Sequence, residues 1–262
     1  GFSPDGREYQ IYLQPGQHTP APWINVIANP TFGTVVTAGG SAYTWAGNSR
    51  ENRLTPFAND PVVDPTSEAI LLRDDDTGEA WSPTPGPLPR DGASGRFVIR
   101  HGAGVTRFER VAHGVRHALD VFVDAVDPVK LSLLTLTNET GLPRRLSVFA
   151  CCVWALGPPR AGQGLHVVTE QDAATGAVLA NKHIVSEKVM VPLPWTYVAG
   201  LFRAARFGTS DAHGLGVVIQ TNYLIEKGAI VVTPDGRFKP VLERFGRVIK
   251  ELAGDLLMIE AT

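Results

Sequence analysis

Short stretches in which apolar and polar residues alternate dominate the first 180 residues, and each stretch ends near Gly, Pro, Asn or Asp. Successive residues of a strand point to opposite faces of a sheet, so this period of two indicates strands with one buried face. Many short strands separated by turn residues favour an antiparallel β-sandwich. The clearest runs are Tyr9–Leu13, Trp23–Ala28, Arg96–Arg100, Val105–Val111, Val115–Val123, Val129–Thr137 and Arg144–Trp154.

Two long runs, Val129–Thr137 and Arg144–Trp154, flank the segment 138–143. That segment contains Gly141 and Pro143, which are residues that turns favour. The pattern therefore predicts a β-hairpin made of these two strands. Cys151 and Cys152 lie in the second strand; neighbouring cysteines rarely bridge each other, so we expect small apolar strand residues without a disulfide.

Beyond residue 190 the hydrophobic period becomes helical. Thr196–Phe207 carries apolar residues on one helical face, and Gly208 follows as a C-cap. A second helix is expected to begin at Ser210 or Asp211 and to run to Lys227. After a short strand at 229–232, the segment 241–257 is predicted to be an amphipathic helix. The expected fold class is therefore mainly β, an antiparallel β-sandwich followed by a small, mainly helical C-terminal segment.

Residue usage changes along the chain as well. Residues 1–180 contain 13 Arg and a single Lys, Lys130, whereas residues 181–262 contain five of each. We therefore divide the chain into a β-sandwich domain over 1–180, a junction of unknown nature over 181–195 and a helical segment over 196–262.

Composition limits the classes of function. The net charge of −2, with Lys and Arg scattered, provides no basic field for nucleic acid. No run of 18 apolar residues is present, so no membrane segment is expected in this chain, and the first residues lack the pattern of a signal peptide. We expect a cytoplasmic location, although a larger parent protein could be membrane-associated.

The segment 40–56, GSAYTWAGNSRENRLTP, combines aromatic residues with amides, a carboxylate and guanidinium groups in a short loop between strands. Aromatic faces bind the C–H faces of sugars, and the polar groups bind hydroxyls through directed hydrogen bonds. This segment is a candidate carbohydrate site; the alternative is a polar turn with two half-buried aromatic residues. The candidate binding residues are Tyr43, Trp45, Asn48, Arg50, Glu51, Asn52 and Arg53.

Long motifs in the same region resemble glycoside hydrolase family 94. The chain is most similar to the phosphorylase-like region of cyclic β-1,2-glucan synthases, and more distantly to cellobiose and chitobiose phosphorylases. The resemblance covers about two thirds of the chain and fades near residue 180. It is carried by TPAPWINVIANPTFGTVVT (19–37), RLTPFANDPVVDP (53–65), EAILLRDDDTGEAWSPTPGPLP (68–89), RHGAGVTRFERVAHGV (100–115) and LTNETGLPRRLSVFACCVWALG (136–157).

This resemblance implies a supersandwich-type β-sandwich that lends loops to the rim of a sugar cleft. In that family an (α/α)6 barrel carries the acid for inverting phosphorolysis, and no matching position exists in this chain. We therefore expect no catalytic residue, no metal and no cofactor here. The expected partners are a weakly bound β-glucan oligosaccharide and the missing barrel domain of the parent protein, so that the isolated chain is inactive.

The segment 196–262 resembles the C-terminal helical part of bacterial relatives of dipeptidyl-peptidase III, a family of zinc metallopeptidases. That chemistry needs a His-Glu pair on a helix, and no His-Glu dipeptide occurs in the sequence. The two resemblances together indicate a chimeric or truncated chain. A remnant metallopeptidase without its zinc site, or a structural or binding module without enzymatic activity, remain alternative functions.

The densest acidic run is Asp74, Asp75 and Asp76 with Glu79, in RDDDTGEAW. Asp and Gly favour a turn between strands at this place. A calcium site and a catalytic carboxylate are the alternatives, and the run lacks EF-hand spacing. His113 and His117 are four residues apart, but they fall in an alternating segment, which argues against a helical metal pair.

Overall fold

The computed structural model describes residues 1–58, 60, 62–88, 95–158, 167–171, 177–186, 189–199, 205–207 and 213–224. These residues form three antiparallel sheets, and none of them is in a helix. The fold of the described residues is therefore mainly β, as the alternating pattern predicts.

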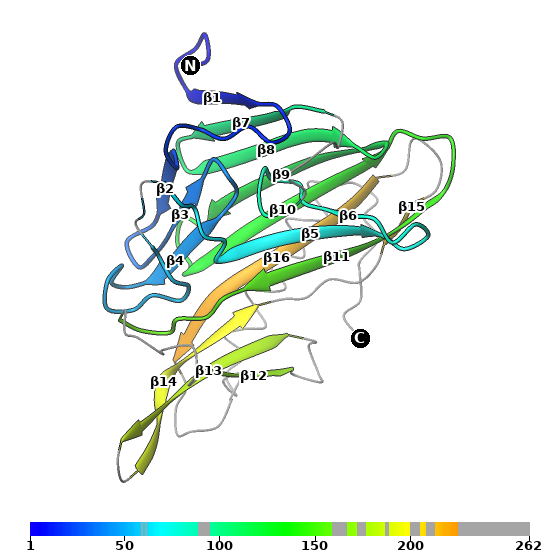
Figure 1. Cartoon of the computed structure of the whole chain (residues 1–262). Coiled ribbons are helices and arrows are strands. Elements are labelled where there is room, and N and C mark those ends of the chain that lie inside the picture. The colour runs from blue at the N-terminus through cyan, green and yellow to red at the C-terminus, as the bar shows by residue number, and fades with distance from the viewer. Residues whose placement is uncertain are drawn as a thin grey trace.

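The largest sheet has nine strands (Figure 1). Its first five strands are neighbours through antiparallel pairs, with Val115–Val123 set against Val105–Ala112 on one side and against Val129–Asn138 on the other. In spatial order the strands are β1 (Glu8–Leu13), β7 (Phe97–Gly102), β8 (Val105–Ala112), β9 (Val115–Val123), β10 (Val129–Asn138), β16 (His213–Leu224), β14 (Val189–Ala199), β13 (Val178–Ser186) and β12 (Val167–Gln171).

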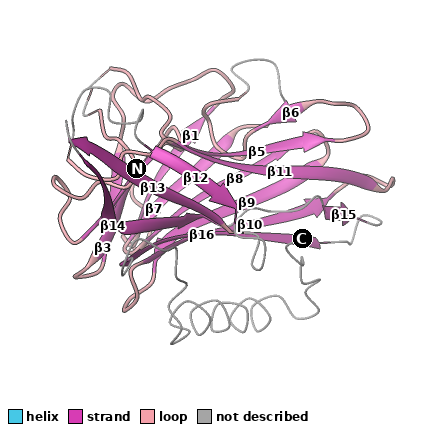
Figure 2. Cartoon of the chain, turned by 90° about the horizontal axis from the view of Figure 1, so that it is seen from below, coloured by secondary structure: helices cyan, strands magenta, loops and turns pink. Residues whose placement is uncertain are grey.

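Two smaller sheets complete the architecture. A four-stranded sheet has the order β15 (Ala205–Phe207), β11 (Arg144–Cys152), β5 (Glu68–Asp74) and β6 (Ala80–Trp81). A three-stranded sheet consists of β2 (Ile24–Ala28), β3 (Phe32–Thr37) and β4 (Ala42–Ala46). In Figure 2, β5 and β11 form a layer separate from β9, β10 and β16, as expected for a sandwich.

The main core lies between these sheets. Leu72 and Trp81 of the four-stranded sheet and Ile99 of the nine-stranded sheet are all fully buried in one apolar cluster. Ile27 and Val36 of the three-stranded sheet belong to the same cluster. The alternating runs of the sequence thus mark the strand faces that meet in this core.

The predicted hairpin of residues 129–154 is wrong in its pairing, although both strands exist. β10 pairs with β9 and β16, whereas β11 pairs with β5 and β15, so the chain passes from one sheet to another at 138–143. Alternation identifies the buried face of a strand but carries no information about its partner. Cys151 and Cys152 both lie in β11, in a predicted strand, and neither is in a disulfide.

The helices predicted over 196–207 and from 210 to 227 are also wrong where the structure describes these segments. β14 includes residues up to Ala199, Ala205–Phe207 forms β15, and His213–Leu224 forms β16. These segments are rich in β-branched and aromatic residues, which favour strands; tertiary pairing with β10 and β13 decides their conformation over the helical period. The predicted strand at 229–232 and helix at 241–257 lie outside the described residues.

Candidate functional site

The candidate loop follows β4, one of the two edge strands of the three-stranded sheet. Tyr43 and Trp45 alternate along β4 and therefore lie on one face of the sheet. Trp45 pairs with Gly33 of β3, and a Cβ at position 33 would come within 2.3 Å of Trp45 Cζ2. The indole thus covers the backbone of a strand glycine, a contact that only the absence of a side chain permits.

Tyr43 is a support of the loop rather than an open aromatic surface. Its ring stacks on Phe57 at a centroid distance of 4.9 Å and tilts toward Trp45 at 5.2 Å, and only 6% of the residue is exposed. The phenol donates a hydrogen bond to the carbonyl oxygen of Ser49. Burial raises the pKa of Tyr43, against the opposing effect of the Arg53 cation.

Residues 47–52 form a compact turn organised by Asn48. Its Oδ1 accepts hydrogen bonds of 2.9 Å from the backbone N–H groups of Arg50 and Glu51, and its carbonyl accepts one of 3.0 Å from Asn52 N–H. The side chains of Arg50 and Glu51 form an ion pair of 3.4 Å and are 80% and 62% exposed. The turn therefore presents a guanidinium and a carboxylate to solvent, with the half-buried Asn52 beside them.

Arg53 lies at the end of this turn and is anchored in the fold. Its guanidinium carbon is 5.6 Å from the centre of the Tyr43 ring, and Nη1 donates to the carbonyl of Phe57 at 3.4 Å. Backbone bridges join it to Trp45 on one side and to Gly157 on the other. The structure thus brings the seven predicted residues into one small region, but with different roles. Arg50 and Glu51 are exposed and Asn52 is half-buried, the exposed Asn48 closes the turn through its hydrogen bonds, and Tyr43, Trp45 and Arg53 are at least partly buried in the fold.

A cavity of about 430 Å³ adjoins the loop and is lined in part by the stacked pair Tyr43 and Phe57. The carboxylate of Asp64 lines it, accepts a 2.5 Å hydrogen bond from Thr37 Oγ1, and has a pKa raised by burial. Sequence reasoning gave Phe57 and Asp64 no role, although both lie in the motif RLTPFANDPVVDP. Their position within that motif is the sequence feature that could have identified them as candidate site residues.

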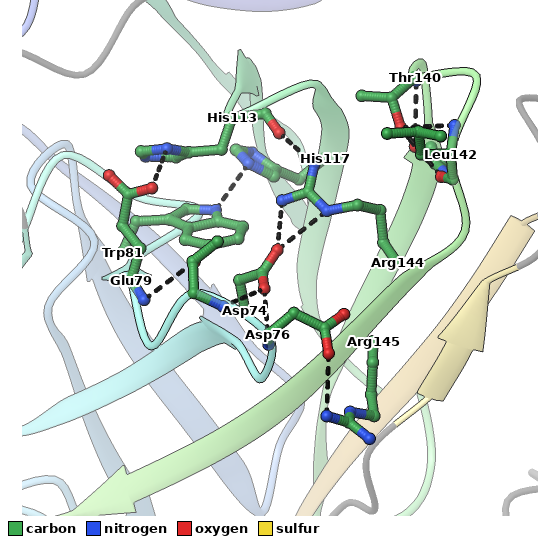
Figure 3. A network of polar contacts seen from close by, with 12 residues as sticks. Asp74, Asp76, Glu79, Trp81, His113, His117, Thr140, Leu142, Arg144 and Arg145 are labelled. Atoms are coloured by element: carbon green, nitrogen blue, oxygen red, sulfur yellow. Dashed lines mark hydrogen bonds and ion pairs between the residues drawn. The ribbon is translucent and has the colours of Figure 1, made fainter.

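The acidic run forms a structural turn (Figure 3). Asp74 Oδ1 accepts hydrogen bonds from the N–H groups of Asp76 and Thr77, and its other oxygen binds the guanidinium of Arg144. Burial alone would raise the pKa of Asp74, but the Arg144 hydrogen bonds hold it below its usual value. Asp75 and Asp76 bind Arg73 and Arg145, so the three carboxylates point to three different partners.

His113 and His117 lie close to this turn and contact different partners. His113 Nδ1 is 3.0 Å from Glu79 Oε2, while His117 Nε2 accepts a 3.0 Å hydrogen bond from Trp81 Nε1. Burial lowers the pKa of His117 to about 3, with Arg110 and His113 adding to the effect. The part of the chain that the structure describes contains no group of three or more metal-ligating side chains, and it contains no helix long and apolar enough to cross a membrane.

Comparison with known proteins gives a family for this architecture. The model of the glycosyl hydrolase 94 supersandwich domain matches residues 7–209. Cyclic beta-(1,2)-glucan synthase NdvB of Rhizobium meliloti (strain 1021) is 38% identical over 180 residues, which cover 69% of this chain and 6% of that protein. N,N'-diacetylchitobiose phosphorylase of Vibrio proteolyticus is 28% identical over 149 residues, covering 57% of this chain and 18% of the relative.

A third relative is named neither as a glucan synthase nor as a phosphorylase. Nudix hydrolase 3 of Arabidopsis thaliana is 34% identical over 82 residues, which cover 31% of this chain and 11% of that protein. The chain therefore spans less than a fifth of each of these three relatives.

Proposed function

The chain belongs to the glycosyl hydrolase 94 supersandwich family, and from this premise we propose that it is the non-catalytic, carbohydrate-binding part of a β-glucan phosphorylase or cyclic β-1,2-glucan synthase. In this proposal a barrel domain of the parent protein holds the catalytic acid, and the loop over 47–53 contributes contacts at the rim of the sugar cleft. The isolated chain then binds oligosaccharide weakly and does not cleave it.

One observation carries the proposal: the turn over 47–52 is rigidly built and yet exposes hydrogen-bonding side chains. The hydrogen bonds of Asn48 close the turn. Tyr43, which stacks on Phe57, supports the turn through its hydrogen bond to the carbonyl of Ser49. Arg50 and Glu51 extend from it into solvent. Because the backbone of the turn is already fixed, binding of hydroxyls by its exposed guanidinium and carboxylate groups costs little backbone conformational entropy.

The cavity beside the loop extends the same surface. At about 430 Å³ it falls in the range of roughly 300–1,000 Å³ that small-ligand pockets occupy. Asp64 at its wall can accept hydrogen bonds from hydroxyls, and Phe57 contributes apolar contact. In this proposal one sugar ring contacts the turn and a neighbouring ring lies against the cavity.

Mapping of backbone amide NMR shifts tests this function. The ¹⁵N-labelled chain is titrated with β-1,2-linked glucose oligosaccharides, and with an α-1,4-linked oligosaccharide of equal length as the control. We expect fast-exchange shifts concentrated at residues 47–53 and around the cavity with the β-linked ligand. Shifts confined to another part of the surface, or an equal response to both ligands, would contradict the proposal.

We also infer that the chain joins two segments of different origin. Lys and Arg usage changes near residue 180: residues 1–180 contain 13 Arg and one Lys, whereas residues 181–262 contain five of each. The family model extends past this point to residue 209, so a junction within the chain would lie inside or after the matched region. Sequencing reads that cross the codons for residues 175–200 in the source DNA test this inference. Continuous reads support a real fusion, and a break in coverage identifies an artificial junction.

A further inference from the structure

We propose that Glu68 is the positioning residue of the candidate sugar loop, because one oxygen of its carboxylate ties together the two ends of that loop. The inference deepens the proposed function and rests on it for its biological meaning, but the tie itself is a property of the fold that can be measured without any sugar.

The two loop ends converge on a single atom. Glu68 Oε1 accepts hydrogen bonds from Thr44 Oγ1 at 2.6 Å and from Thr55 Oγ1 at 2.7 Å. Thr44 directly precedes Trp45, and Thr55 comes two residues after Arg53, so the pair of threonines brackets every exposed residue of the candidate site. A carboxylate oxygen has two lone pairs, and here each receives a hydroxyl from a different end.

Backbone hydrogen bonds add to this closure. Thr44 N–H donates to Thr55 Oγ1 at 2.9 Å, and Leu54 N–H donates to the carbonyl of Thr44 at 2.8 Å. The hydroxyl of Thr55 therefore accepts from one end of the loop while it donates to Glu68. Its removal breaks two of the contacts that close the loop, which makes Thr55 the best site for a test.

Lys130 makes this arrangement possible. Its Nζ is 2.6 Å from Glu68 Oε2, and the two side chains are only 2% and 7% exposed. Burial opposes the charge on Glu68, but the Lys130 ammonium and the hydrogen bonds from Thr44 and Thr55 together outweigh it and keep the pKa of that carboxyl below its usual value. The acceptor therefore stays ionised, and an ionised acceptor forms the stronger hydrogen bonds.

The ion pair also lies where the three sheets meet. Lys130 belongs to β10 of the nine-stranded sheet, Glu68 to β5 of the four-stranded sheet, and Thr44 to β4 of the three-stranded sheet. A buried ion pair adds little net stability compared with apolar residues of the same size. The directed contacts of the pair instead fix the relative positions of β10, β5 and β4. The ends of the loop are therefore held in place by all three sheets.

Hydrogen exchange of the peptide 46–54 in the full chain tests the proposal. Thr55→Val keeps the shape of the side chain and removes the hydroxyl, whereas Thr55→Ser keeps the hydroxyl. Loss of these two closing contacts should speed exchange in this peptide on the order of 10-fold in Thr55→Val and leave Thr55→Ser close to wild type. Thr106→Val is the matched control, because Thr106 is equally buried but binds Asn25 and His101 away from the loop.

The outcomes separate the tie from the sugar site. Faster exchange confined to 46–54, with restoration by serine, supports the proposal. Unchanged exchange in Thr55→Val, or equal acceleration in the peptides of β9 and β10, overturns it. If Thr55→Val does not fold, Thr44→Val tests the other end by the same criterion. Absence of sugar binding by the wild-type chain contradicts only the proposed function, since the exchange result stands without it.

Discussion

Trp45 lies across the backbone of Gly33, so closely that a β-carbon on residue 33 would approach Trp45 Cζ2 to 2.3 Å. The two residues are direct neighbours in the β3–β4 pair, next to the turn that carries the exposed polar groups. The absence of a side chain at Gly33 therefore allows the indole to take this position. The indole in turn packs beneath the start of the loop.

Replacement of this glycine should disturb both stability and the indole. In Gly33→Ala the new methyl group overlaps the ring, which must move or strain the strand. We expect a loss of about 1–3 kcal/mol in the free energy of unfolding, together with a shift in tryptophan fluorescence. Urea unfolding followed by fluorescence measures both. Gly141→Ala is the control, since nothing lies within 4 Å of a Cβ there; a loss no larger than that of the control would contradict the packing described for Trp45.

The ion pair of Lys130 and Glu68 leads to a second prediction. Lys130→Met leaves a buried carboxylate without its cation, and such losses cost about 3–5 kcal/mol. The double variant Lys130→Met/Glu68→Gln removes both charges and should recover a large part of this loss. Denaturant unfolding at pH 7 compares the two variants, and equal stability of the single and double variants would show that the pair is not coupled as its geometry indicates.

The pH dependence of the same single variant has a definite sign. Without Lys130, burial raises the pKa of Glu68 in the folded state above its usual 4.5, so the folded protein binds a proton that the unfolded chain releases. The deficit of Lys130→Met relative to wild type should therefore be smaller at pH 4.5 than at pH 7. A deficit that grows as the pH falls would contradict this reasoning.

The burial of His117 leads to a prediction of how the stability of the wild-type chain changes at acid pH. Its pKa is about 3 in the folded state and 6.5 without burial, so the unfolded chain binds the extra proton between these values. The stability that depends on a neutral His117 is present above pH 6.5 and is lost as the pH falls, by about 1.4 kcal/mol per pH unit from this group.

A substitution isolates that contribution. His117→Gln retains an acceptor for Trp81 Nε1 but cannot be protonated. Urea unfolding between pH 4 and 7 should therefore show a flatter pH dependence in the variant than in wild type. Parallel curves for the two proteins would mean that His117 does not titrate between the folded and unfolded states.

Particular residues show how far the sequence predicts this structure. The alternating run Val115–Val123 coincides with β9, because one face of that strand is buried and the other is not. β3 gives no such signal, since all six residues of Phe32–Thr37 are buried and the period of two disappears. The partner of β11 is set by long-range contacts such as that of Arg144 with Asp74, which are 70 residues apart and leave no local pattern.

The sequence indicates which residues form the candidate loop, but not what each of them does in the structure. The mixture of aromatic and polar residues at 43–53 is visible in the sequence, and the structure collects them in one region. Burial decides which of them face solvent, and it turns Tyr43 into a support. Lys130 offered a signal that composition alone could not interpret. It is the single lysine of residues 1–180 and lies in a mostly buried strand, where a buried cation requires an anion such as Glu68.

The central claim is that the exposed turn binds β-glucan weakly because it forms only part of a cleft. Isothermal or NMR titration of the full chain with β-1,2-linked glucose oligosaccharides measures this most directly. We expect a Kd on the order of millimolar, since a few hydrogen bonds and one aromatic contact leave about −4 kcal/mol after the cost of association. Arg50→Ala/Asn52→Ala should abolish saturation, whereas Arg7→Ala, a similarly exposed arginine at 86%, should bind as wild type does. A micromolar Kd, or millimolar binding that survives the double substitution unchanged, would contradict the account.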